Sequence, residues 1–220
     1  MSFLGYLASA CAGYFLGAIP TGCVVGRLRG VDIRAVGSGN IGATNVFRTL
    51  GPVAGVLVLA FDAFKGYLAC FVAGQWIAQA LDTAGAGPAP TRESLAIVAG
   101  VAAILGHNYT FWLRFKGGKG IATSAGVLIS WTPLPLLVCL AIWLVVLAWS
   151  RYVSLASMAA ALCLPLVVAL LKGSPLLIAT TTALGSMAIL KHRANILRLC
   201  QGTEHRLGAK PPAPNLPVSK

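Results

Sequence analysis

Residues 3–26 read FLGYLASACAGYFLGAIPTGCVVG and contain no charged side chain. A helix of about 20 apolar residues crosses the hydrocarbon core of a bilayer, so this stretch is long enough to span a membrane. No basic segment precedes it, which favours a retained span over a cleaved signal peptide. Backbone groups in lipid must be satisfied within the chain, and uncharged runs of this length favour helices over barrel strands. The glycine pairs at 13 and 17 and at 22 and 26 have the spacing that lets helices pack closely.

The rest of the chain repeats this apolar character. Of its 220 residues 57% are hydrophobic and 10% charged, with a mean hydropathy of +0.82. Further apolar runs cover about 53–80, 94–106, 121–130, 134–149, 153–171 and 175–190. The two short runs, 94–106 and 121–130, are either extended by flanking residues or re-entrant. We therefore expect an all-α integral membrane protein with about seven transmembrane helices, forming one domain over residues 1–208. The Pro-rich segment 209–220 is expected to be a disordered cytoplasmic tail.

Basic residues indicate the orientation. With seven spans, fourteen of the 17 lysines and arginines fall in loops on one side, Arg92 and Lys172 fall on the other, and Lys65 lies within a span. Positive charge accumulates in cytoplasmic loops, so the N-terminus is predicted outside and the C-terminus in the cytoplasm. The net charge of +12 then fits topology and anionic ligands better than nucleic acid.

A first polar segment, GSGNIGATNVFR at 37–48, is predicted on the cytoplasmic side. Glycines let a backbone turn sharply near a ligand, and neutral donors with an arginine fork suit a phosphate. The alternative is an ordinary glycine-rich loop that caps a helix. Its candidate ligand-binding residues are Gly37, Ser38, Gly39, Asn40, Thr44, Asn45 and Arg48.

A second segment contains GHN at 106–108 and FKGGKG at 115–120, directly before an apolar run. Lys119 is thereby predicted at a helix N-terminus, where exposed amides and the helix dipole favour anions. It is not a Walker A loop, because Gly120 stands where Ser or Thr is required. The alternative is a basic membrane anchor. The candidates are His107, Gly117, Gly118, Lys119 and Gly120.

A third segment, KHRANILRL at 191–199, places His192 and Asn195 three residues apart, on one face if the segment is helical. The alternative is a basic helix that binds anionic lipid headgroups. Glu204 is expected to be structural, pairing with Arg193 or Arg206.

Asp62 and Lys65 are three residues apart within an apolar run. Charges in a membrane span are costly and tend to pair, so a structural ion pair is expected, and a proton or ion path is the alternative.

Other chemistries lack their residues. No His is followed five positions later by Asp, no G-x-S-x-G turn is present, and the five acidic residues are scattered. We therefore expect no metal and no cofactor.

Together the segments resemble the bacterial membrane family of acyl-phosphate-dependent glycerol-3-phosphate acyltransferases. The resemblance rests on GSGNIGATNVFRTLG at 37–51, GHNYTFWLRFKGGKGIAT at 106–123, HRANILRLCQGTE at 192–204, and the D-x-x-K-G motif at 62–66. Ile41 and Thr110 depart from it, because the family often has proline there.

The resemblance implies a reaction. An acyl phosphate donates its acyl group to the 1-hydroxyl of sn-glycerol 3-phosphate, giving lysophosphatidic acid and phosphate at the start of phospholipid synthesis. It also implies a bacterial inner-membrane location, an active site facing the cytoplasm, contact with membrane lipid, and a partner enzyme that makes acyl phosphate.

The resemblance also implies roles for the candidates. Ser38, Arg48 and Lys119 would hold phosphate, and Gly117, Gly118 and Gly120 would shape the glycerol 3-phosphate site. His192 and Asn195 would orient the hydroxyl or stabilise the carbonyl oxygen. Whether His192 or the departing phosphate takes the proton is open at this point, and so are two other classes of function: a transporter of phosphate or an organic phosphate, and a lipid-binding scaffold.

Overall fold

The computed structural model describes residues 2–84 and 90–209, which form helices and their connections. The elements are α1 (Ser2–Ala18), α2 (Thr21–Leu28), α3 (Ala43–Leu50), α4 (Pro52–Phe71), the π-helix η1 (Val72–Ile77), α5 (Ala78–Thr83), α6 (Arg92–Asn108), the 3-10 helix η2 (Phe111–Leu113), α7 (Ile121–Trp131), α8 (Pro133–Ser150), α9 (Val153–Leu170), α10 (Pro175–Lys191) and α11 (Arg193–Cys200).

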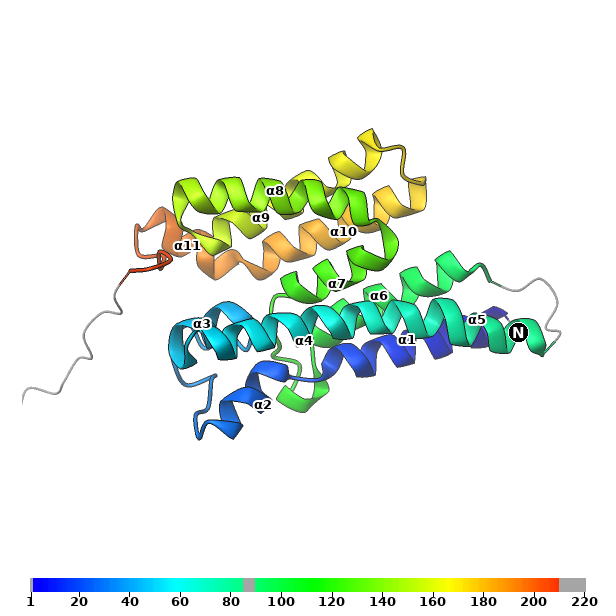
Figure 1. The fold of residues 1–220 in the computed structure, drawn as a ribbon, viewed down its shortest axis with the longest axis horizontal. Coiled ribbons are helices and arrows are strands. Elements are labelled where there is room, and N and C mark those ends of the chain that lie inside the picture. The colour runs from blue at the N-terminus through cyan, green and yellow to red at the C-terminus, as the bar shows by residue number, and fades with distance from the viewer. Residues whose placement is uncertain (1, 85–89, 210–220) are drawn as a thin grey trace, which may run out of the picture.

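The long helices form two groups with α7 between them (Figure 1). α1, α4 and α6 pack against one another on one side, and α8 and α10 each pack against α9 on the other. Small residues allow the first group to pack closely: a Cβ at Gly13 or Gly17 would lie 2.2 or 2.0 Å from the carbonyl oxygen of Ala99 or Ala103. This spacing was predicted to bring two helices together. Gly22 and Gly26 face loop carbonyls of Ile41 and Val31 instead.

Five helical segments are long and apolar enough to cross a membrane. They are 3–28, 52–83, 92–113, 133–150 and 153–170; the helices at 121–131 and 175–191 are apolar but shorter. The run at 94–106 is thus extended by its flanks, whereas 121–130 stays short. The predicted first span bends, because Pro20 separates α1 from α2 and cannot donate a backbone hydrogen bond. An all-helical membrane protein is therefore what the chain forms, while the count of seven spans stays a prediction.

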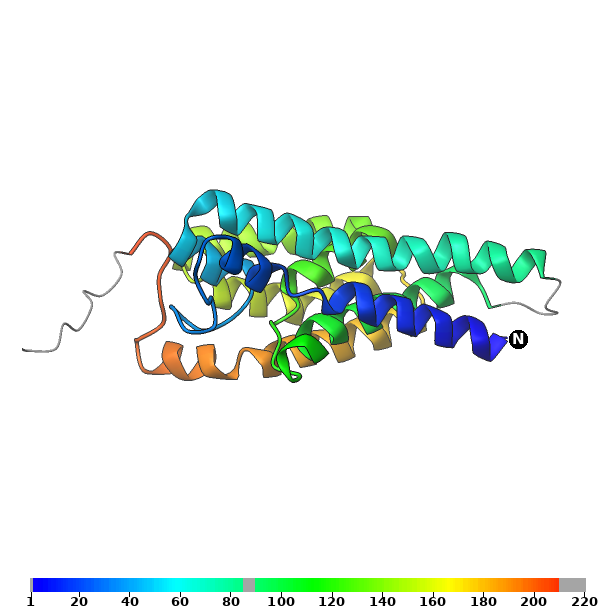
Figure 2. The same ribbon diagram turned by 90° about the horizontal axis from the view of Figure 1, so that it is seen from below.

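The two ends of the molecule differ in charge. α2, α3 and α11 gather at one end, and the start of α1 and the beginning of α6 lie at the other (Figures 1 and 2). The first end carries the arginines of α2, α3 and α11, and the second carries Arg92. The membrane sidedness read from this asymmetry stays a prediction. Apart from Ala209, the predicted tail lies outside the described residues, as do residues 85–89.

Candidate active site

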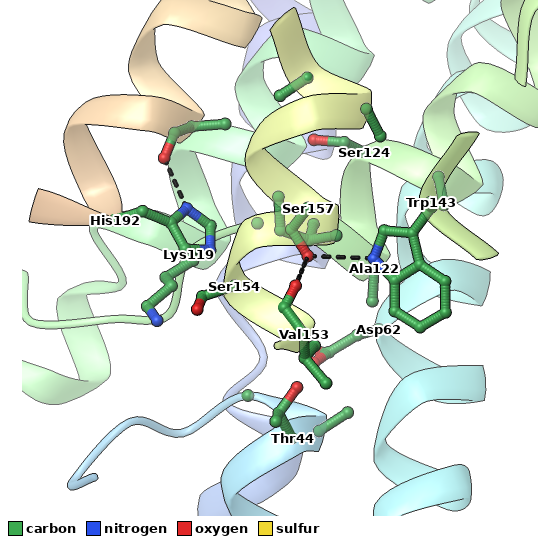
Figure 3. Close-up of a pocket in the computed structure, with 18 of the residues that line it drawn as sticks. Thr44, Asp62, Lys119, Ala122, Ser124, Trp143, Val153, Ser154, Ser157 and His192 are labelled. Carbon is green, nitrogen blue, oxygen red and sulfur yellow. Dashed lines mark hydrogen bonds between the residues drawn. The ribbon is translucent and has the colours of Figure 1, made fainter. Parts of the chain in front are cut away.

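A cavity of about 470 Å³ lies between the two helix groups. It begins at the basic end of the molecule, where α2, α3 and α11 carry their arginines, and continues into the interior; Figure 3 shows part of its lining. Its polar end is formed by α3, the start of α7, the end of α10 and α11; its apolar part continues between α7, α8 and α9. Residues from all three predicted segments meet there. Of the residues predicted to bind substrate or act in catalysis, those lining this cavity are Ser38, Asn40, Thr44, Asn45, Arg48, His107, Lys119, Gly120, His192 and Asn195, and the two predicted structural acids Asp62 and Glu204 line it as well.

Asn45 organises the first segment from within. Its buried amide nitrogen donates to the carbonyl oxygens of Ile33, Val36 and Asn40 at 2.9–3.1 Å, and its Oδ1 accepts from the Ser38 amide at 2.9 Å. These bonds fold 33–40 into a compact turn. Gly37 has φ +60°, and a Cβ there would lie 2.3 Å from the Asn45 Oδ1. Gly37 and Gly39 thus shape the turn without lining this cavity, and they leave Ser38 exposed at the cavity mouth.

Arg48 lies on α3 and lines the same cavity. Its guanidinium donates to the His205 carbonyl oxygen at 3.2 Å, across 157 residues of sequence. The contact ties the first segment to the chain that follows α11, so a single cation braces two separate parts of the site.

The glycines of the second segment pack on the last turn of α6. The amides of Gly117 and Gly118 donate to the carbonyl oxygens of Asn108 and His107 at 3.2 and 3.0 Å. Gly120, with φ +79°, precedes α7, so the predicted helix start after Lys119 is confirmed. Two loop amides are therefore already bonded within the protein, and the side chain of Lys119 is the group of this loop that is suited to pair with a phosphate.

The third segment is not one helix. α10 ends at Lys191, His192 is its C-cap, and α11 starts at Arg193, so the condition for a shared helix face, one helix through His192 and Asn195, is not met. His192 Nδ1 lies 2.7 Å from the Ala188 carbonyl oxygen (Figure 3). A carbonyl only accepts, so Nδ1 carries the proton and Nε2 is left with a lone pair. Burial, with help from the charge of Lys119, lowers the pKa of His192 to about 4, and the ring is neutral at pH 7.

Glu204 joins α9 to α11 beneath the polar end of the larger cavity. Its buried carboxylate accepts from Ser154 at 2.8 Å, Asn195 at 2.7 Å and Arg198 at 2.7 Å. The expected pairing with Arg193 or Arg206 is replaced by Arg198, one turn before the loop that carries Glu204. Although burial opposes it, these hydrogen bonds hold the pKa of Glu204 below its usual value. The charge is thus well satisfied, as in a structural role.

A smaller cavity of about 190 Å³ adjoins the polar end. It shares Ser38, Asn40, Lys119 and Asn195 with the larger one. Its other lining residues are Gly117, Gly118, Lys191, Arg193, Ala194 and Arg198. Among the residues that the structure describes, four basic side chains and no carboxylate line this space, which suits a small, doubly charged anion.

Asp62 and Lys65 form a buried ion pair, with 2.7 Å between Oδ1 and Nζ. His107 adjoins it, with Nδ1 3.0 Å from Lys65 Nζ. His107 was predicted to bind substrate. The structure shows it buried against the Asp62–Lys65 pair, and it also lines the larger cavity.

Polar groups on α9 and α8 were missed by the sequence reasoning. Ser154 and Ser157 face the cavity, and Ser157 accepts from Trp143 Nε1 at 3.1 Å (Figure 3). The signal available was two serines three apart in an otherwise apolar helix, which places both hydroxyls on one face.

Comparison with known proteins gives a consistent result. Residues 7–202 match the family model described as glycerol-3-phosphate acyltransferase. A glycerol-3-phosphate acyltransferase of Geobacter sulfurreducens is 43% identical over 212 residues, covering 94% of this chain and all of its own, and that of Geotalea daltonii is 45% identical over 192 residues, covering 87% and 92%.

Two crystal structures are similar along most of the chain. Both are of PlsY (YgiH), an integral membrane glycerol 3-phosphate acyltransferase. The glycerol 3-phosphate form has 38% identity and a TM-score of 0.80, covering 92% of this chain and 96% of its own. The lysophosphatidic acid form has 37% identity and a TM-score of 0.78, covering 92% and 95%. With three motifs converging on one cavity in a helical membrane fold, the chain belongs to the glycerol-3-phosphate acyltransferase family and is an integral membrane acyltransferase.

Proposed function

We propose that this enzyme transfers a fatty acyl group from acyl phosphate to the 1-hydroxyl of sn-glycerol 3-phosphate, at a site facing the cytoplasm of a bacterial inner membrane. The observation that carries the proposal is the meeting of two unlike cavities at Ser38, Lys119 and Asn195. One is small and basic, and the other has a polar mouth and a long apolar interior. An enzyme that joins a small phosphate to a fatty chain needs such a pair.

The smaller cavity suits glycerol 3-phosphate. Lys191, Arg193, Arg198 and Lys119 surround a space too small for an acyl chain. Charge-assisted hydrogen bonds from such side chains are the strong contacts made to phosphates. Ser38 at the shared boundary is then available to the glycerol hydroxyls or to the donor's phosphate.

The larger cavity suits the acyl phosphate. Its phosphate would lie at Arg48 and Lys119, and its chain along the apolar walls of α7, α8 and α9. Leu59 of α4 and Leu140 of α8 line this cavity and are 50% and 45% exposed. This exposure supports a lateral opening between these helices, through which a chain dissolved in the bilayer would enter without crossing water.

The chemistry requires little covalent assistance. Acyl phosphate is a mixed anhydride, so the glycerol hydroxyl can attack the carbonyl carbon directly while the bond from that carbon to the phosphate oxygen breaks. Lys119 and Arg48 stabilise negative charge on the carbonyl oxygen and the departing phosphate. Holding both substrates in line supplies most of the remaining rate.

The proton of the hydroxyl has two acceptors. His192 Nε2 is unprotonated, but a pKa of about 4 makes it a weak base before substrates bind. Two bound phosphates would raise that pKa, because negative charge favours the imidazolium form. The departing phosphate is the other acceptor, and His192 then orients the hydroxyl rather than removing its proton.

Phosphate release by purified protein in detergent tests the proposal. Palmitoyl phosphate and glycerol 3-phosphate together should release phosphate and form lysophosphatidic acid, and neither substrate alone should do so. Turnover with palmitoyl-CoA instead would overturn the choice of donor. A transporter would require two compartments and would show no product in detergent, which separates it from an enzyme.

A further inference from the structure

A buried ionic cluster lies where α4 crosses the end of α6 and the break between α1 and α2. Lys65 Nζ donates to the Ile19 carbonyl oxygen at 2.8 Å, beside Pro20, and lies 2.7 Å from Asp62 Oδ1. The Thr21 hydroxyl also donates to Asp62. The side chains of Asp62, Lys65 and His107 are at most 6% exposed. Charges within spans are costly unless paired, so this cluster holds three helices in register.

His107 belongs to the cluster through one edge of its ring. Nδ1 lies 3.0 Å from Lys65 Nζ. An ammonium group only donates, so Nδ1 accepts and the ring is neutral, with its proton on Nε2. Lys65 thereby fixes both the tautomer and the orientation of the imidazole.

The opposite edge of the ring supports the loop before Lys119. A Cβ built on Gly118 would lie 2.1 Å from His107 Nε2 and 2.9 Å from Cε1. The Gly118 amide also donates to the His107 carbonyl oxygen at 3.0 Å. Gly118 is buried, and the space that a side chain there would need is filled by the imidazole.

We propose that His107, held by Lys65 and Asp62, is a positioning residue that seats Gly118 and so places Lys119 where the two cavities meet. Position 118 must be glycine because the imidazole occupies the Cβ site, and not because a phosphate approaches the backbone there. This inference rests on the proposed function for the identity of the ligands. The cluster of Asp62, Lys65 and His107 would thereby affect catalysis. Without the His107 imidazole, the backbone at Gly118 could move, and Lys119 would no longer be held in position.

The consequence is a selective loss of affinity for glycerol 3-phosphate. Gly117, Gly118 and Lys119 all line the smaller, basic cavity. Of these three described residues, Lys119 alone also lines the larger cavity. Displacing a positioned group by about 1 Å can cost on the order of a hundredfold in rate. His107→Ala should therefore raise KM for glycerol 3-phosphate by more than it raises KM for palmitoyl phosphate.

A double-mutant cycle tests the contact itself. Gly118→Ala alone should lower kcat/KM for glycerol 3-phosphate, because its methyl group collides with His107. In the His107→Ala background the same substitution should have little further effect, because the space is open. A matched control is Gly74→Ala in η1, where the nearest atoms to an added Cβ are 3.5 Å away. Leu95→Ala, a fully buried position near the other end of α6, should lower the thermal midpoint and leave both KM values unchanged.

Equal effects of Gly118→Ala in both backgrounds would overturn the proposal, because the glycine would then be required by something other than His107. If His107→Ala does not accumulate in membranes, the pair Asp62→Asn/Lys65→Met removes the support of the ring without leaving a buried charge. That variant should show the same selective rise in KM for glycerol 3-phosphate, and an unchanged ratio of the two KM values would sink the idea. Parent enzyme without phosphate release would instead refute the proposed function, so the two failures are distinguishable.

Discussion

Lys119 Nζ donates to Asn195 Oδ1 at 2.6 Å, and this contact joins the loop before α7 to α11 across 76 residues of sequence. Asn195 in turn donates to Glu204 at 2.7 Å, so the ammonium group, the amide and the carboxylate form one chain of hydrogen bonds. The carboxylate holds Asn195 with its oxygen toward the lysine, and Lys119 is thereby fixed where the two cavities meet.

Lys119 should set the alkaline limit of activity. Burial lowers its pKa to about 8, so the amine is charged below that pH and neutral above it. The charged form binds phosphate, and kcat/KM is therefore expected to fall as pH rises through about 8. A phosphate monoester titrates near pH 6, so the substrate does not produce this limb. Lys119→Arg should weaken activity but remove the limb, since arginine stays charged. An alkaline limb unchanged in Lys119→Arg would contradict the assignment.

His192, Ser38 and Arg48 should each be needed for turnover and not for folding. Loss of one stabilising or proton-handling group typically costs about a hundredfold to a thousandfold. His192→Ala, Ser38→Ala and Arg48→Ala are expected to lower kcat/KM on that order, measured by phosphate release. Thr182→Ala, at an exposed position on α10, is the control and should leave the rate unchanged. Near-normal turnover of any of the three would remove that residue from the site.

Glu204 should support the site through structure. Glu204→Gln retains the shape but loses the charge that Arg198 contacts at 2.7 Å. A hydrogen bond to a charged group contributes about 1.5–3 kcal/mol, so the thermal midpoint is expected to fall. Activity should fall as well, because Asn195 and Lys119 lose their anchor. Glu93→Gln, at an exposed position in the first turn of α6, should change neither quantity.

Trp131 should limit the length of the acyl chain. It lines the larger cavity at the end of α7, about 15 Å along the helix from Ile121 at 1.5 Å per residue. Its indole donates to the Ala96 carbonyl oxygen at 3.3 Å and fills the space above Gly100. Trp131→Ala should open this space and shift the preference from lauroyl or palmitoyl phosphate toward stearoyl phosphate. Trp149→Ala is the matched control, because Trp149 is 84% exposed. An identical chain-length profile in both variants would contradict this role.

Local chemistry allowed much of this molecule to be anticipated from its sequence. Uncharged runs must be helices in lipid, so the helical class and most helix limits followed from composition alone. Gly120 before an apolar run predicted the start of α7, and the spacing of Gly13 and Gly17 predicted close helix packing, which the structure shows between α1 and α6. The three polar motifs at 37–51, 106–123 and 192–204 were sufficient to identify the acyltransferase family.

Contacts between distant segments were decided only by the tertiary structure. No local pattern indicates that Glu204 pairs with Arg198 or that His107 fills the space beside Gly118. The spacing of Ser154 and Ser157 places them on one face of a helix, but only the packing shows that this face lines the cavity. The chain also breaks between α10 and α11 at His192, which the spacing of His192 and Asn195 could not reveal. The sequence determines the secondary structure of each segment and the hydrogen-bonding groups it carries, because helix propensity and hydropathy act over a few residues. Which residues from distant segments come into contact depends on how whole helices pack, and that packing is a property of the complete chain.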